Sequence, residues 1–261
     1  MIRARFLQTS LFRRPAEPKL LMVDVGGTVC PVRISRNRRA RRYTLRIHTA
    51  SREAILTMPL RGNLAEASRF AEAHSGWLAQ RLRQLPEVAP FCEGEIVPLR
   101  GTDHRIVHRP RTRGTVWVEQ ADDGPLICAA GQREHLPRRV RDFLKREARR
   151  DLEAALAVYA RVLDVRVTRL SIRDQSSRWG SCNSAGVLSF SWRLILAPPF
   201  VLDYLAAHEV AHLVEMNHSA RFWKLLRRIC PMTDAATRWL DAHGNALHRY
   251  GGAEQVDPRP G

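Results

Sequence analysis

Apolar and polar residues alternate in short runs over much of the first half of the chain. Residues 43–48 and 54–58 form two such runs around a short polar segment, so they predict a β-hairpin. Further strand-like runs lie between Gly94 and Ala130, where glycines and prolines mark the turns. This alternation predicts a β-rich N-terminal region over residues 1–135.

One helical pattern interrupts the strand-like runs. From Leu64 to Leu85, apolar residues recur every three or four positions, which predicts an amphipathic helix. Asn63 stands at the N-cap position, Glu66 follows three residues later, and Pro86 ends the pattern. The N-terminal region is therefore expected to contain one helix.

The second half of the chain has longer helical periods. After Pro137, which suits the first turn of a helix, apolar residues follow one face as far as Leu163. Two strands are then predicted at 165–172 and 187–194, and three helices beginning near Pro199, Ser219 and Asp234. We expect an α+β protein with a second domain of helices on a small sheet at residues 136–250, and a flexible tail at 251–261.

The predicted helix after Pro199 carries the sequence His208-Glu209-Val210-Ala211-His212. Histidines four residues apart project from one face of a helix, about 6 Å apart along its axis. That separation suits two ligands of one zinc ion, and the glutamate beside the first histidine is then placed to act on a metal-bound water. The pattern predicts a metal-dependent hydrolase.

A third histidine, His218, follows His208 at the offset of the third ligand in HExxHxxxxxH zinc sites. Glu215 is the main competitor, because it lies three residues past His212 on nearly the same helix face. The chain has to turn back before His218, and Asn217 is expected to make that turn because asparagine tolerates left-handed backbone geometry. We predict a zinc site formed by the three histidines.

Zinc held by three neutral imidazoles keeps its full charge, which lowers the pKa of a bound water towards about 7. Glu209 is predicted to take the proton of that water and to pass it to the leaving group. His243 and His248 are weaker candidates for ligands, because both are expected on the surface of the last helix.

The chain is strongly basic, with a net charge of +17 and a pI near 11.1. Nearly all of this charge is arginine, which binds phosphate in a bidentate fork and so makes nucleic acid or nucleotides candidate partners. A codon preference for arginine is the competing interpretation. The arginines gather at 36–46, at 105–113 and along the helix after Pro137.

The cysteines and the apolar segments bear on the environment of the protein. Its 5 cysteines stand singly, which argues against a disulfide framework and favours a reducing cytoplasm. No apolar run approaches the roughly 20 residues of a membrane span. Asp24 interrupts the apolar segment near the N-terminus, so a signal peptide is not expected. Nothing in the sequence indicates the oligomeric state.

The segment between the two predicted strands, residues 177–182, is rich in Gly, Ser, Trp and Arg. Either it is a tight turn anchored by Trp179, or it lies at the rim of the cleft with Arg178 facing the substrate. The following strand is expected at a sheet edge, where an extended peptide adds as another strand. This makes Arg178, Trp179, Ser189 and Phe190 candidate substrate-binding residues.

The motifs Arg178-Trp179-Gly180-Ser181-Cys182, His208-Glu209-Val210-Ala211-His212 and Asn217-His218-Ser219, with Phe222-Trp223, resemble those of the YgjP-like metallopeptidase family. That family is related to the SprT and WLM zincins. The resemblance implies zinc bound by His208, His212 and His218, with Glu209 catalytic, on a minimal zincin-like fold. It implies a reaction type rather than a defined substrate.

Three functions are therefore compatible with the sequence. The first is a zinc-dependent metallopeptidase that acts on a peptide or protein, near nucleic acid if the arginine surface binds it. The second is a metal-dependent phosphohydrolase of nucleotides. The third is a non-catalytic nucleic-acid-binding protein with structural zinc, against which Glu209 and the open fourth position of the zinc site argue.

Overall fold

A computed structural model describes residues 19–48, 52–85, 87–112, 114–175 and 178–251. It divides into two compact units, and the chain passes from the first to the second between Arg83 and Gln84. This division differs from the boundary expected near residue 136. Strands that had been assigned to the N-terminal region share one apolar core with the helices that follow them. The expected tail at 251–261 lies almost wholly outside the described residues.

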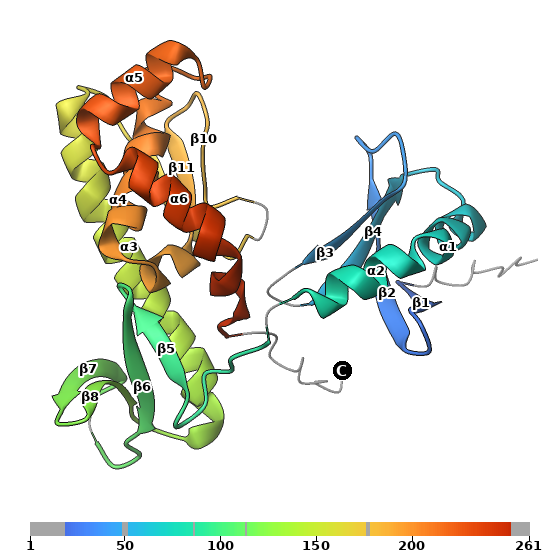
Figure 1. The fold of residues 1–261 in the computed structure, drawn as a ribbon, viewed down its shortest axis with the longest axis horizontal. Helices are drawn as coiled ribbons and strands as arrows, with labels where there is room; N and C mark the ends of the chain where they lie inside the picture. Colours follow the sequence, from blue (N-terminus) through green and yellow to red (C-terminus); the bar gives the residue numbers. More distant parts are fainter. Residues whose placement is uncertain (1–18, 49–51, 86, 113, 176–177, 252–261) are drawn as a thin grey trace, which may run out of the picture. The chain divides into compact units, whose positions relative to one another are not determined.

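In its described residues, the first unit is a four-stranded sheet with two helices (Figure 1). The strand order is β1-β2-β4-β3; β1 and β2 are antiparallel, β2 and β4 are parallel, and the predicted hairpin partners β3 and β4 are neighbours. Apolar residues of the strands and of both helices form one buried cluster. The elements are β1 (Leu20–Asp24), β2 (Val29–Asn37), β3 (Thr44–His48), β4 (Glu53–Pro59), α1 (Leu64–Ala73) and α2 (Ser75–Arg83).

The single helix predicted over residues 64–85 is two helices in the structure. The predicted N-cap is confirmed, because the Asn63 side chain accepts a hydrogen bond from the Ala65 amide at 2.8 Å. The chain leaves helical geometry at His74, with φ of −107° and ψ of 14°, and Gly76 close behind it weakens helix propensity. The two helices therefore meet at His74.

Where the structure describes it, the second unit contains two sheets and four α-helices (Figure 1). One sheet has the order β5-β6-β8-β7, and the other has the order β10-β11-β9. The strands are β5 (Ile96–Leu99), β6 (Thr102–His108), β7 (Val116–Ala121), β8 (Gly124–Ala129), β9 (Arg169–Arg173), β10 (Gly180–Cys182) and β11 (Val187–Ser191). The helices are α3 (Leu136–Val162), α4 (Pro199–Ala211), α5 (Ala220–Ile229) and α6 (Thr233–His243), with 3-10 turns η1 (Arg133–His135), η2 (Trp192–Leu196) and η3 (Gly244–Arg249).

The long helix α3 holds this unit together. Its 27 residues span about 40 Å, and it contacts β7 and β8 as well as η2, α4 and β9. Its buried side chains follow the apolar stripe that the sequence predicted, including Val140, Leu144, Leu152 and Leu156. One core therefore runs from the β5–β8 sheet to the helix that carries the histidine motif. No helix in the described residues has both the length and the apolar character required to cross a membrane.

The strand β11 corrects one expectation. It pairs with β10 on one side and with β9 on the other, so it is the central strand of its sheet. The prediction that this strand lies at a sheet edge is therefore wrong. An alternating pattern reports one buried face of a strand, but it does not report how many neighbours the strand has. Within the described residues, β10 and β9 form the edges of this sheet.

Candidate metal centre

Helix α4 carries His208 and Glu209 near its C-terminal end, and His212 is its C-cap residue. It is apolar around most of its circumference, which is typical of a buried helix, and it packs against α3, α5 and α6. The prolines before it suit a helix start and α4 begins at Pro199, as predicted. The two histidines thus come from the end of a helix that is held rigidly inside the core.

His218 reaches the same site through a turn after α4. The Asn217 side chain accepts a hydrogen bond from the Ser219 amide at 3.2 Å, and Ser219 then caps α5 by accepting from the Phe222 amide at 3.4 Å. The prediction of left-handed geometry at Asn217 is wrong, because the positive-φ non-glycine residues of the described chain lie elsewhere. Asn217 instead makes the turn with its side-chain oxygen.

The three histidines converge on one point. Each offers a ring nitrogen, and these atoms lie within 4.8 Å of one another. The Nε2 atoms of His208 and His218 are 3.1 Å apart, close to the roughly 3.3 Å that separates two ligands of a tetrahedral zinc ion with bonds near 2.0 Å. Three imidazoles at this spacing fit a divalent cation such as zinc. In the part of the chain that the structure describes, no other group of three His, Cys, Asp or Glu side chains converges in this way.

The nitrogens that face away from this point have partners that orient the rings. His212 Nδ1 lies 3.1 Å from the Glu215 carbonyl oxygen, which requires the proton on Nδ1 and leaves Nε2 as the ligand atom. His208 Nδ1 lies 3.4 Å from the Tyr204 hydroxyl. Glu215, the competing ligand of the sequence analysis, thus serves the site through its backbone.

Two aromatic side chains of α5 support the histidine rings. Phe222 is fully buried, and its ring centroid lies 5.0, 4.6 and 4.9 Å from those of His208, His212 and His218. The Trp223 ring lies 5.8 Å from His218 and 6.2 Å from His208. These contacts restrict the rings to one arrangement.

Burial keeps His208 and His212 neutral. It lowers the pKa of His208 to about 4, with further contributions from His212 and His218, and it also lowers the pKa of His212. Neutral imidazoles have the free electron pair that a metal requires. Two of the three ligands are thus ready to bind a metal at neutral pH.

Glu209 is buried beside the ligands and faces β10. Burial raises the pKa of its carboxyl to about 7, against which the positive charge of Arg178 acts. A metal dication at the histidines would lower this pKa again through its charge. Gly180 makes room for the carboxylate, because a Cβ at that position would lie 2.8 Å from Glu209 Cγ and closer still to Oε1. Burial likewise raises the pKa of Cys182 to about 11, so this thiol is protonated at neutral pH.

The four predicted substrate-binding residues differ in burial and contacts. Arg178 is exposed, and its positive charge acts to lower the pKa of Glu209. Trp179 stacks on His248, with ring centroids 5.0 Å apart, and packs against Gly244, which favours the anchoring interpretation of this residue. Phe190 is fully buried in the core and its backbone is paired on both sides, so its prediction as a substrate contact is wrong.

Ser189 lies on the same central strand, β11. It pairs with Ser181 of β10 on one side and with Ser171 of β9 on the other. Addition of a peptide to its strand is therefore excluded. Of the weaker ligand candidates, His248 is buried rather than on a surface, and burial lowers its pKa to about 4.

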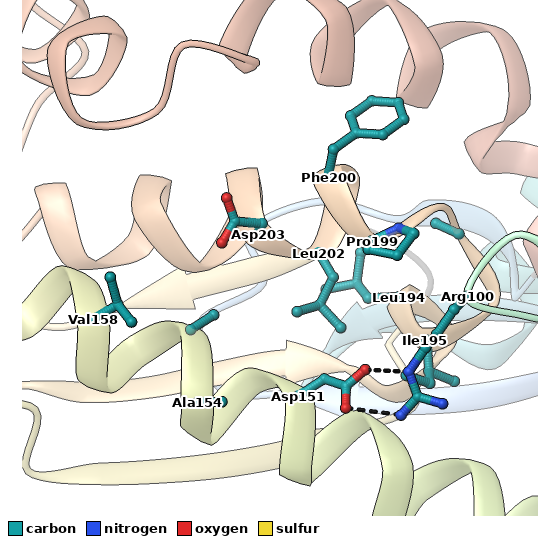
Figure 2. A pocket seen from close by; sticks show the side chains of 12 residues that line it. Arg100, Asp151, Ala154, Val158, Leu194, Ile195, Pro199, Phe200, Leu202 and Asp203 are labelled. Atoms are coloured by element: carbon teal, nitrogen blue, oxygen red, sulfur yellow. Dashed lines mark hydrogen bonds and ion pairs between the residues drawn. The ribbon is translucent and has the colours of Figure 1, made fainter.

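A separate hollow of about 500 Å³ lies between α3 and the first turns of α4 (Figure 2). Its lining is mostly apolar, and the ion pair between Arg100 and Asp151 stands at one side of it. None of the predicted site residues lines this hollow. It is therefore distinct from the metal centre, although both involve α4.

Sequence reasoning missed two residues that shape the site. Tyr204 precedes His208 by one helical turn, so helical spacing alone was a usable signal. Gly180 belongs to the motif of residues 178–182. Its contact with Glu209 joins segments that are far apart in the chain, so no pattern in the neighbouring sequence could have predicted it.

A family model and a solved structure are similar to this chain. A family model described as YgjP-like, metallopeptidase domain, matches residues 41–243. Among curated proteins no match was found. The crystal structure of the metallopeptidase zymogen of Pyrococcus abyssi abylysin is similar to 38% of this chain and 97% of its own, with 21% sequence identity and a TM-score of 0.32. Because the family model matches well over half of its length, the chain belongs to the YgjP-like metallopeptidase family.

Proposed function

We propose that this protein is a zinc-dependent peptidase in which His208, His212 and His218 hold the metal and Glu209 is the general base. The observation that carries the proposal is the convergence of three imidazoles beside a buried carboxylate. When bound, zinc supplies positive charge that polarises the peptide carbonyl and acidifies water. A carboxylate next to that point is placed to accept a proton from the attacking water.

Glu209 has two features that suit this role. Only 5% of its surface is exposed, so bulk water has little access to the carboxylate and its interactions are stronger than at the surface. Gly180 leaves the space beside β10 that the Glu209 side chain occupies next to the histidines. After accepting the proton, Glu209 passes it to the departing amine, so the residue acts first as base and then as acid.

We propose that the substrate peptide adds to the strand β10. This strand lies at the edge of its sheet in the described residues, contacts α4, and begins with the glycine that backs Glu209. A peptide that adds to this edge brings its backbone next to the general base. The edge strand that binds the peptide is therefore β10, and not β11 as the sequence had predicted.

The arginines of residues 36–46 have no part in the proposed reaction. Arg36 uses its guanidinium within the first unit, where it donates to the Leu60 and Gly62 carbonyl oxygens at 2.7 and 3.0 Å. Arg38, Arg39, Arg41 and Arg42 are exposed, and a nucleic-acid partner for them stays a prediction.

The test is a Glu209→Gln substitution in the zinc-loaded protein. We expect the variant to retain its zinc by elemental analysis and to lose peptide cleavage by about 100-fold or more, since a general base contributes that much. Glu153→Gln, the same change at an exposed site on α3, is the matched control and keeps full activity. His218→Ala is expected to lose zinc.

Cleavage of an unfolded protein and of nucleoside triphosphates is measured in parallel. Hydrolysis of triphosphates without peptide cleavage would overturn the proposal, as would full peptide cleavage by metal-replete Glu209→Gln.

A further inference from the structure

A basic pocket lies next to the metal centre, between α5 and α6. Its volume is about 810 Å³, within the range of ligand sites. We call it the α5–α6 pocket; it is lined by Trp223, Lys224, Arg227, Asp234, Thr237 and Arg238.

This pocket shares a wall with the histidines. The Trp223 ring that lies 5.8 Å from His218 also lines the pocket. On the other wall, Thr237 lies against the Tyr204 hydroxyl, which in turn is 3.4 Å from His208 Nδ1. A molecule bound in the pocket is therefore separated from the ligands by a single layer of side chains.

The charges in the pocket are unbalanced. Arg227 is paired with Asp234 at 3.2 Å and lies over the Trp223 ring at 5.7 Å. Lys224 and Arg238 have no ion-pair or hydrogen-bond partner among the described residues, although both line the same pocket. Two unneutralised cations beside an aromatic surface favour an anion that has an apolar stem.

Resting on the proposed peptidase function, we propose that the α5–α6 pocket is a specificity subsite that binds the carboxylate of an acidic side chain near the scissile bond. Glutamate fits this site best, because its methylenes can lie along Trp223 while its carboxylate meets Lys224 and Arg238. A polynucleotide is less favoured, since Asp234 contributes a negative charge to the pocket that would repel phosphates.

The first experiment uses quenched fluorescent peptides that differ only by Glu or Gln at each position flanking the cleavage site. The zinc-loaded wild type is expected to cleave the Glu peptide with a kcat/KM about 10-fold higher at one position, the value of one charge-assisted contact. Lys224→Glu and Arg238→Glu should each abolish this preference and favour a Lys peptide instead. Arg228→Glu, the same charge change on an exposed face of α5 outside the pocket, should leave the preference unchanged.

The second measurement is independent of catalysis. Calorimetry records binding of the same peptides to zinc-loaded Glu209→Gln protein, in which we expect Lys224→Glu to weaken binding of the Glu peptide about 10-fold. Cleavage without Glu preference would overturn the subsite and leave the peptidase standing. Charge-dependent binding without any cleavage by the wild type would overturn the peptidase and leave the pocket as an acidic-peptide site.

Absence of both cleavage and binding would overturn both proposals. A short single-stranded oligonucleotide is the remaining probe; if Lys224→Glu weakens its binding but not that of the Glu peptide, the pocket binds nucleic acid and the subsite is refuted.

Discussion

The two four-stranded sheets of this protein have the same strand order but different tasks. The orders are β1-β2-β4-β3 and β5-β6-β8-β7. The pairs β1–β2 and β5–β6 are antiparallel, and the pairs β2–β4 and β6–β8 are parallel. In each case the fourth strand leads into a helical segment, α1 in the first unit and η1 with α3 in the second. The sequence showed no repeat, so the shared arrangement is visible only in the structure.

The helices that follow explain the difference. The first sheet is followed by two short helices, of 10 and 9 residues, which complete a core of their own. The second sheet is followed by the 27-residue α3, which continues past the sheet to α4. The same arrangement of strands is a closed unit in one case and a support for the metal centre in the other.

The turn between β5 and β6 makes this support direct. The Arg100 amide donates to the Ile195 carbonyl at 2.7 Å, and the Gly101 amide to that of Leu196 at 3.2 Å, so the turn is bonded to η2 just before α4 begins. We therefore expect matched substitutions in the two units to have different effects. A substitution in the first unit should lower stability alone, whereas one in the second should also affect the metal centre.

The largest effect is expected from glycine substitutions that compare the two units. Gly180→Ala places a methyl group where the Glu209 side chain lies, and a displaced base lowers kcat by about 100-fold. Gly62→Ala in the first unit meets Met58 and the Tyr43 hydroxyl at 3.0 and 3.1 Å and is expected to lower the melting temperature without changing kcat. Steady-state kinetics and zinc analysis distinguish these outcomes, and an equal loss of kcat in both variants would contradict the division of tasks.

An intermediate effect is expected from the ion pairs that join elements in each unit. Arg100 contacts Asp151 at 2.7 Å (Figure 2) and Glu147 at 2.8 Å. The three side chains are only 15–29% exposed. Arg100→Ala leaves two half-buried carboxylates with fewer partners and should lower the free energy of unfolding by about 2 kcal/mol. Arg33→Ala breaks the more exposed pair with Glu53 and should cost less than about 1 kcal/mol.

Urea unfolding followed by tryptophan fluorescence measures the Arg100 effect, because every tryptophan except Trp77 lies in the second unit. Circular dichroism follows both units and is needed for Arg33→Ala. Similar losses from the two variants would mean that the β5–β6 turn does not hold α4.

The smallest effect is expected from the helix caps. Asn63→Ala and Ser219→Ala each remove a side-chain cap, which typically costs about 1 kcal/mol. Ser219 follows the ligand His218, so its loss should also weaken zinc affinity, whereas Asn63→Ala should leave it unchanged. Competition with a chromogenic chelator measures this difference; unchanged zinc affinity in Ser219→Ala would show that the turn holds His218 without its cap.

Several features could be predicted because they depend on neighbours in the sequence. The N-cap Asn63, the helix starts at Pro199 and near Ser219, and the apolar stripe of α3 were all predicted and are all confirmed. The approach of His218 to His208 was predicted from a spacing of ten residues, and the structure brings their ring nitrogens together. The metal centre is largely local in this sense, because all three histidines lie in one helix and the turn after it.

Other features could not be predicted because their partners are distant in the chain. The position of β11 in the centre of its sheet depends on β9 and β10, which flank it on either side. The unit boundary depends on the packing of β5–β8 against α3 rather than on a change in composition.

For this protein, the sequence by itself determined the spacing of the histidines, the glutamate beside the first of them and the helix that carries them, because a helix repeats every 3.6 residues whatever surrounds it. Tertiary structure decided which strand edge meets Glu209, why residue 180 has to be glycine, and where unpaired cations gather beside Trp223. These outcomes depend on contacts between segments that only folding brings together, and side-chain periodicity carries no record of such partners.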